Sequence, residues 1–161
     1  MRRYPSGYKG AVYFRNYNRE KTVMNPNEKG RNTEALVLTY ILGLGYSVSI
    51  PFGDKDRYDQ IWDIDGKLLR VQVKTSRLKK EKNPENVSIC FSCKSSINGK
   101  IRKYSENEID YFATYWDGRV YLIPVTECSA EKTLRFISSQ SYQPNICWAK
   151  DYEVEELIKR L

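Results

Sequence analysis

A two-residue turn signal in the middle of the chain sets the pairing of two strands. Polar and apolar residues alternate on both sides of Asp65-Gly66, a dipeptide typical of a tight β-hairpin turn. If Ile64 pairs with Lys67, every further pair follows by counting, and Asp59 lies opposite Gln72. Alternation along the strands then predicts a polar face of Asp59, Ile61, Asp63, Leu68, Arg70, Gln72 and Lys74, and a core face of Tyr58, Trp62, Ile64, Leu69, Val71 and Val73.

Three polar side chains of this hairpin, Asp59, Gln72 and Lys74, are expected to converge. Directly opposed residues have Cβ atoms about 4.5–5.5 Å apart, and diagonal neighbours remain within reach. Carboxylate and side-chain carbonyl oxygens suit Mg²⁺, and an ammonium beside them can orient or deprotonate water and stabilise phosphate charge. The same residues also fit an ordinary solvated sheet face. Asp54 and Asp56 are rival ligands, but they follow a turn where Asp commonly bonds to the local backbone.

The rest of the chain predicts one mixed α/β, or α+β, domain around a single sheet. Helical spacing of Ala35, Leu38 and Leu42, with Val37 and Ile41, predicts a helix over about 32–44. Asn32 or Thr33 is its expected cap, and Gly43 or Gly45 its expected end. Further predicted elements are strands at 46–52 and 87–93, a short helical turn at Ser105, a second hairpin at Asp117-Gly118 and a terminal helix at 151–161.

Residues 1–28 differ in composition from the predicted domain at 29–161. In residues 1–28, basic residues alternate with tyrosines. Basic groups meet phosphates and aromatic rings stack on bases, so this segment suits an arm that contacts nucleic acid. An extra strand that covers the domain, or a dimer contact, explains the pattern equally well.

Composition narrows the function classes. The chain of 161 residues has 27 Lys and Arg against 20 Asp and Glu, a formal charge of +7 that favours an anionic partner such as nucleic acid. It has no histidine, which excludes Ser-His-Asp triads and His-ligated zinc. Without a signal sequence or a membrane span, a cytoplasmic, nucleoid-associated protein is expected.

The four cysteines, Cys90, Cys93, Cys128 and Cys147, are too few for a disulfide scaffold and are expected to be free thiols. A zinc site is disfavoured, because Cys90 and Cys93 fall on opposite faces of one strand and no second Cys-x-x-Cys follows.

Two groups of basic residues are candidates for DNA contact. Phosphate contact is expected in and after the second strand of the hairpin, and base-edge contact further along the chain, although a solvated loop explains such residues as well. The candidates are Arg70, Arg77, Lys79, Lys80, Lys82, Lys94, Arg102 and Lys103.

Asp59, the run Gln72-Val73-Lys74 and a preceding helix with Glu34 together form a recognisable pattern. The segments around these residues agree with the same pattern. In chain order they are KGRNTEALV, IPFGDKDRYD, VQVKT, IDYFATYW, VYLIPV and WAKDYE. Over about residues 29–152, the chain resembles the PD-(D/E)XK nuclease superfamily and its group I intron-associated homing endonuclease branch. The resemblance implies a restriction-endonuclease-like core, a central mixed sheet flanked by helices.

The resemblance also implies Mg²⁺-dependent hydrolysis of DNA phosphodiesters, with Mn²⁺ as a substitute. Asp59 matches the central metal ligand, Lys74 the catalytic lysine and Glu34 the helix glutamate that approaches the metal, while the Val73 carbonyl is a further ligand. Gln72 stands where most of the superfamily has Asp or Glu, and Tyr58 replaces the motif proline. A neutral ligand weakens metal affinity, so we hypothesise that Glu34 counts for more here.

The expected function is a site-specific double-strand cut in DNA. One small domain supplies one active site, so a homodimer or homotetramer is expected. Two alternatives stay open: a structure-selective nuclease that resembles Holliday junction resolvases, and a DNA-binding module that has lost its activity through Gln72.

Overall fold

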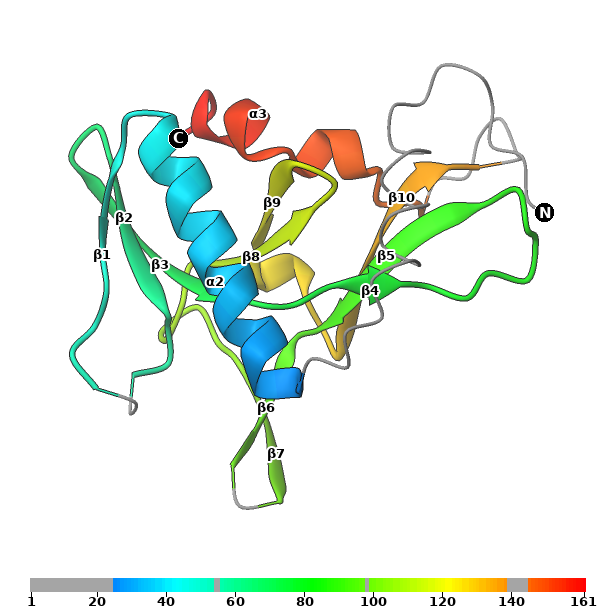
Figure 1. Cartoon of the computed structure of the whole chain (residues 1–161), viewed down its shortest axis with the longest axis horizontal. Helices are drawn as coiled ribbons and strands as arrows, with labels where there is room; N and C mark the ends of the chain where they lie inside the picture. Colours follow the sequence, from blue (N-terminus) through cyan, green and yellow to red (C-terminus); the bar gives the residue numbers. More distant parts are fainter. Residues whose placement is uncertain (1–24, 54–55, 98, 139–144) are drawn as a thin grey trace.

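A five-stranded mixed sheet lies at the centre of the computed structural model, which describes residues 25–53, 56–97, 99–138 and 145–161 (Figure 1). Its order is β1-β2-β3-β8-β9, and β3 and β8 run parallel while the other neighbours run antiparallel. The strands are β1 (Ser47–Ser49), β2 (Gln60–Ile64), β3 (Lys67–Val73), β8 (Tyr111–Trp116) and β9 (Arg119–Pro124). The predicted central mixed sheet is confirmed, but the expectation of a single sheet is wrong, because the described residues form two further, smaller sheets. Of the predicted arm, residues 1–24 lie outside the described residues.

The β2–β3 hairpin has the predicted register. Ile64 pairs with Lys67, and the pairing continues without a shift to Gln60 and Val71. Asp65 has φ 52° and Gly66 has φ 89°, the positive pair that a tight type I′ hairpin turn requires. The second predicted hairpin is also confirmed, with its turn at Asp117-Gly118 between β8 and β9.

Tyr58 does not lie where the alternation placed it. It was expected on the core face with Trp62, but it packs against the residues on the opposite face of the sheet. The reason is local: β2 begins at Gln60 and the chain bends at Asp59, so alternation does not extend to Tyr58.

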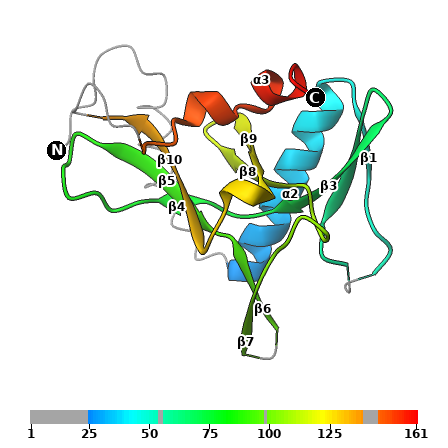
Figure 2. The same cartoon turned by 180° about the vertical axis from the view of Figure 1, so that it is seen from behind.

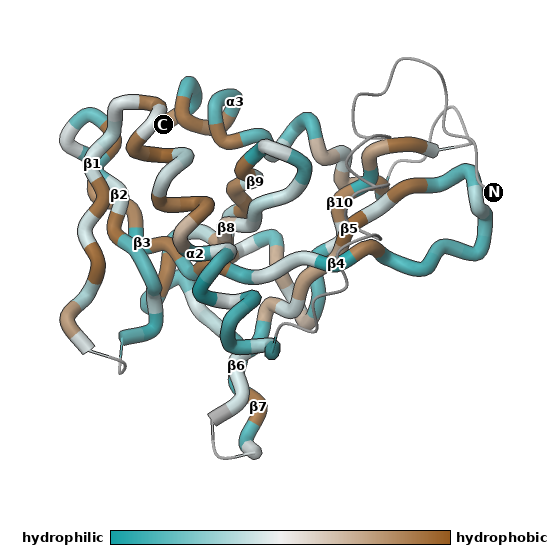
Figure 3. Tube along the Cα trace, viewed as in Figure 1, coloured by the Kyte–Doolittle hydropathy of each residue, from teal (hydrophilic) through white to brown (hydrophobic). Residues whose placement is uncertain are grey.

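Helix α2 (Pro26–Gly43) covers one face of the sheet, and it begins six residues before the predicted start. Asn25 caps it and forms a capping box with Glu28, with Pro26 at the first helical position. The first turns are polar, as Figure 3 shows, so apolar spacing did not mark them. The buried face is Thr33, Val37 and Ile41, whereas the predicted face residues Ala35 and Leu42 are exposed.

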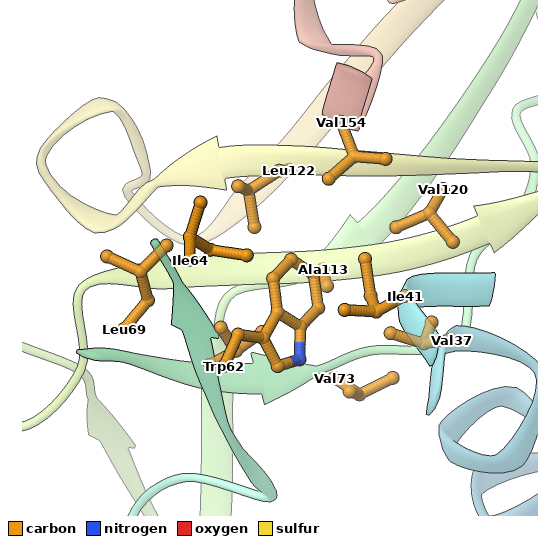
Figure 4. Packing of buried hydrophobic residues seen from close by; sticks show 11 residues of the cluster. Val37, Ile41, Trp62, Ile64, Leu69, Val73, Ala113, Val120, Leu122 and Val154 are labelled. Atoms are coloured by element: carbon orange, nitrogen blue, oxygen red, sulfur yellow. The ribbon is translucent and has the colours of Figure 1, made fainter. Parts of the chain in front are cut away.

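The core under α2 joins the helix to the hairpin. Figure 4 shows Val37 and Ile41 directed toward Trp62 and the neighbouring strands. The buried cluster also contains Ile64, Leu69, Val71, Val73, Ala113, Val120, Leu122 and Val154. The last of these comes from α3 (Val154–Ile158), which with the 3₁₀ turn η2 (Ala149–Tyr152) replaces the longer terminal helix that was predicted.

The other face of β8 and β9 packs against strands rather than a helix. Phe112, Tyr121 and Ile123 alternate with the residues of the first cluster and contact a second one with Ile89, Phe91 and Leu134. These come from a three-stranded sheet of order β10-β5-β4, formed by β4 (Arg77–Leu78), β5 (Val87–Ser92) and β10 (Glu131–Ile137). The 3₁₀ turn η1 (Val125–Glu127) connects β9 to this sheet.

A two-stranded hairpin, β6 (Lys94–Ile97) and β7 (Lys100–Lys103), projects below the body of the molecule (Figures 1 and 2). All four residues of β7 are exposed, including Ile101. No described helix is long and apolar enough to span a membrane.

The packing of α2 predicts a sharp contrast between two neighbouring residues. Ile41 is 0% exposed and Leu42 is 51% exposed. We expect Ile41→Ala to lower the free energy of unfolding by about 2–5 kcal/mol, because it leaves a cavity in the core. Leu42→Ala should change it by less than about 0.5 kcal/mol. Urea unfolding followed by circular dichroism measures both, and equal losses would contradict the packing of α2 on the sheet.

Candidate active site

Asp59 lies where the regular pairing of β2 with β3 ends. Its backbone N–H donates to the Val71 carbonyl at 2.9 Å, which holds the residue beside β3. Its Oδ2 accepts hydrogen bonds from the Val73 backbone N–H at 2.8 Å and from Gln72 Nε2 at 2.5 Å. The expected juxtaposition of Asp59 and Gln72 is therefore present, and the carboxylate is fixed by two donors from the facing strand.

Glu34 comes to the same place from α2, and a buried glutamine anchors it there. Gln60, only 2% exposed, donates from Nε2 to the Glu34 carbonyl at 2.9 Å. Its Oε1 accepts from Trp62 Nε1 at the same distance, so the whole amide is satisfied inside the core. Sequence analysis missed Gln60. Its signal was a polar residue at a core-facing position of an alternating strand.

A second contact ties α2 to the other end of the site. Thr33 Oγ1 lies 2.9 Å from Thr75 Oγ1, which directly follows Lys74 in the chain. Thr75 Oγ1 also donates to the Lys29 carbonyl at 3.4 Å. The helix is thus attached at the Glu34 carbonyl itself and at Thr33, the residue before it, which sets the position of the Glu34 carboxylate relative to β3.

The pKa values of both carboxyl groups at this place are raised above their ordinary values. Burial raises the pKa of Asp59, opposed by the Val73 N–H, the Lys74 charge and the Gln72 amide. Burial, followed by the negative charge of Asp59, raises the pKa of Glu34, while Arg31 and Lys74 lower it. The surroundings therefore disfavour the ionised form of both carboxyl groups, and a cation bound beside them would stabilise that form.

The oxygen atoms around Gln72 fit a hard divalent cation. Gln72 Nε2 donates both to Asp59 Oδ2 and, at 3.3 Å, to the Val73 carbonyl, so two acceptors converge on one partly positive group. A half-turn of the amide would present its own oxygen in the same place. Carboxylate, amide and backbone oxygens are the ligands that Mg²⁺ prefers. Over the described ranges no three His, Cys, Asp or Glu side chains form a metal cluster, and the side chain beside Asp59 here is the amide of Gln72.

Lys74 completes the set of predicted catalytic residues. Its backbone N–H donates to the Ala113 carbonyl at 2.8 Å, which continues the parallel pairing of β3 with β8. Its Nζ lies 3.3 Å from the Tyr104 hydroxyl and 3.4 Å from the Lys94 carbonyl. Its charge acts on both Asp59 and Glu34. Two carboxylates can bind a cation, and the ammonium beside them can stabilise the negative charge of a phosphate.

Among the predicted DNA-binding residues, Arg70 has a structural partner. Its guanidinium binds Asp110 through Nε and Nη2, and also donates to the carbonyls of Asn107 and Glu106. This ion pair lowers the pKa of Asp110 against the opposing effect of burial. Arg70 thus closes the loop before β8 onto β3.

The other predicted DNA-binding residues lie in two separate places. Arg77, Lys79, Lys80 and Lys82 lie on β4 and the stretch toward β5, at the end of the molecule opposite β1 (Figure 1). Lys94, Arg102 and Lys103 belong to the β6–β7 hairpin. Because Lys74 reaches the Lys94 carbonyl, the hairpin is the group that adjoins the site.

The rival metal ligands and the cysteines have other surroundings. Asp54 lies outside the described residues, and Asp56 is exposed. All four cysteines are free thiols, as expected, with Cys90 and Cys93 buried.

Comparison with known proteins is consistent with this geometry. No curated protein matches the sequence. The fold is similar to that of a bacterial homing endonuclease, I-Ssp6803I, with a TM-score of 0.60 and 22% sequence identity, over 84% of this chain and 93% of that one. Residues 24–155 match the family model described as PD-(D/E)XK endonuclease. This chain, with Asp59, Gln72 and Lys74 on its β2–β3 hairpin, belongs to the PD-(D/E)XK endonuclease family.

Proposed function

We propose that the chain is a Mg²⁺-dependent endonuclease that cuts both strands of DNA at specific sites, as a homing endonuclease does. The observation that carries the proposal is the convergence of Glu34, Asp59, the Gln72-Val73 pair and Lys74 at one point between α2 and β3. Membership in the family supports nuclease activity, and the basic β6–β7 hairpin supports DNA as the substrate.

The proposed roles follow from the chemistry of each group. Asp59, the Gln72 amide oxygen and the Val73 carbonyl would hold the cation, with Glu34 approaching from α2. A cation bound there would act as a Lewis acid that withdraws charge from the scissile phosphate. Lys74 places positive charge beside the phosphate and exchanges a proton with the attacking water.

A double-strand cut requires two such sites, one for each strand. The residues that the structure describes contain a single set of these groups, so we propose that the chain acts as a homodimer or homotetramer. Mn²⁺ is proposed to replace Mg²⁺, because the ligands are all oxygen atoms.

Cleavage assays with matched aspartate variants test the proposed activity. The substrate is a pool of long random duplexes with a four-way junction included. We expect Asp59→Asn to lower the cleavage rate by about 10³-fold or more and Lys74→Ala by about 10²-fold or more. Asp63→Asn is the control, because Asp63 lies in β2, four residues after Asp59, and its side chain accepts a turn hydrogen bond from the Gly66 backbone N–H.

Three outcomes of this assay would redirect the proposal. Cutting of the junction alone would indicate a structure-selective nuclease. Binding of duplex DNA without cutting under any divalent ion would indicate a DNA-binding module in which Gln72 has abolished the activity. An equal loss in Asp63→Asn and Asp59→Asn would remove Asp59 from the site.

The charge of the ligand set predicts opposite effects of two substitutions on the Mg²⁺ requirement. Gln72→Glu adds a negative ligand, and we expect it to lower the Mg²⁺ concentration for half-maximal cleavage by about tenfold. Glu34→Gln removes one, and we expect an increase of about the same size. Metal titration of cleavage and calorimetry with Mn²⁺ measure both, and an unchanged requirement in both variants would contradict the proposed ligand set.

The same site predicts how cleavage depends on pH. The pKa values of Asp59 and Glu34 are raised, so as the pH falls these carboxyl groups take up protons while ordinary carboxyl groups are still ionised. Protons then compete with the cation, and cleavage is lost on the acid side. A tenfold increase in Mg²⁺ should move this acid limb to lower pH by up to about one unit if one proton is displaced.

The β6–β7 hairpin is expected to contact the DNA backbone. Lys100→Ala combined with Lys103→Ala should reduce the slope of log affinity against log salt by about 0.9 for each lysine lost. Lys150→Ala combined with Lys159→Ala is the charge-matched control, on η2 and next to α3, at the opposite side of the molecule (Figure 2). Equal changes in the two double variants would mean that net charge alone, and not the hairpin, sets the affinity.

A further inference from the structure

The ammonium of Lys74 rests on the base of the β6–β7 hairpin and not on a carboxylate. Nζ contacts the Lys94 carbonyl, where β6 begins, and the Tyr104 hydroxyl, directly after β7 ends. It also lies 4.9 Å from the centroid of the Tyr104 ring. Within the part of the chain that the structure describes, no ion pair joins Lys74 to an acidic side chain.

Tyr104 is itself held on two sides. The edge of its ring packs against Phe112 of β8, with centroids 5.3 Å apart and an interplanar angle of 85°. The Arg57 guanidinium covers the ring at 4.0 Å from its centroid. The ring therefore lies between the core of the central sheet and a cation, with the hydroxyl directed to Lys74.

Arg57 is in turn fixed by three partners around the hairpin. It donates to Glu108 Oε1 at 3.0 Å, to Ser95 Oγ at 2.8 Å and to the Lys103 carbonyl at 3.1 Å. The side chains of Arg57 and Glu108 are only 17% and 15% exposed, so solvent screens this ion pair less than a surface pair. Because Arg57 precedes Asp59 by two residues, one set of contacts joins the metal-ligand strand, Tyr104 and the hairpin.

We propose that Tyr104 is a positioning residue for Lys74, and that Arg57 holds Tyr104 in place for this role. The proposal rests on the nuclease function proposed above. A lysine side chain has four flexible carbons and loses rotamer entropy when it is fixed, so a catalytic lysine benefits from contacts that fix it beforehand.

The chemistry of the contacts fits positioning. Both partners of the ammonium are uncharged oxygens, so they fix its place without neutralising the charge that the phosphate requires. An ammonium has three N–H donors, and the two contacts occupy two of them. The third remains available for a water or a phosphate oxygen.

Removal of one hydroxyl tests the proposal. Tyr104→Phe keeps the ring that packs on Phe112 and under Arg57. We expect the single-turnover cleavage rate at saturating DNA to fall by about tenfold, as for the loss of one hydrogen bond to a charged group. The DNA dissociation constant, measured with Ca²⁺ in place of Mg²⁺, should stay within about twofold. The control is Tyr46→Phe, a tyrosine packed against the core on the α2 side of the sheet.

A second background separates positioning from a general structural effect. In Lys74→Ala, Tyr104→Phe should cause no further loss of the residual rate, because its effect passes through the ammonium. An equal loss in both backgrounds, an unchanged rate, or a faster rate would overturn the proposal. A faster rate would mean that Tyr104 holds Lys74 away from the reaction.

Crystal structures provide a readout that does not require cleavage. We expect Lys74 Nζ to be ordered at the Tyr104 hydroxyl in the wild type, and its side chain to be disordered in Tyr104→Phe. A wild-type crystal with Nζ elsewhere would overturn the positioning role even if the enzyme cuts DNA. A wild type that holds Lys74 as described but cuts no DNA would instead refute the proposed function, and with it the catalytic purpose of the contact.

Discussion

The candidate site depends on two hydrogen bonds that Asp59 Oδ2 accepts. These bonds form because the regular pairing of β2 with β3 ends just before Asp59. Pairing runs without a shift from the Asp65-Gly66 turn to Gln60 and Val71. One residue further, the chain bends, and the Asp59 side chain turns to the Val73 N–H and the Gln72 amide. A shift of one residue in this register would move Gln72 to the core face and Val71 to the site. Turn chemistry thus determines which side chains meet at the candidate site.

The two ionised carboxyl groups at the candidate site lower the stability of the folded chain. A carboxyl group whose pKa is raised by folding binds protons more tightly in the native state, so its stabilising contribution is present at low pH and lost as the pH rises. Asp59 and Glu34 are both of this kind. The attachments of α2, through Gln60 on one side and Thr33 on the other, keep the two carboxylates together despite this repulsion. A cation bound as proposed would offset the repulsion, and its binding would then be linked to stability.

Patterns in the sequence predicted the parts of the structure that interactions between neighbouring residues determine. The two hairpins and the meeting of Asp59 with Gln72 followed from turn residues and alternation, whereas the central mixed sheet was expected from the family resemblance. The start of α2 did not, because Asn25 and Glu28 cap a polar turn without apolar spacing. The β-strand cover over Phe112 and the contact of Tyr104 with Lys74 join distant segments, and no spacing in one sequence encodes such contacts. The contact of Gln60 with α2 also joins distant segments, but the sequence gives a signal for it, because Gln60 is a polar residue at a core-facing position.

Gln72 explains how the site keeps its shape with two repelling carboxylates nearby. A glutamate there would add a third negative charge and leave Asp59 Oδ2 and the Val73 carbonyl without a side-chain donor between them. The amide group supplies that donor, since Nε2 bonds to both oxygens. If the proposed cation binds, the amide would turn and offer its oxygen, which needs no change in backbone or protonation. Gln72 thus keeps the negative charge of the site low, and its amide holds the Asp59 carboxylate and the Val73 carbonyl together in the absence of a cation.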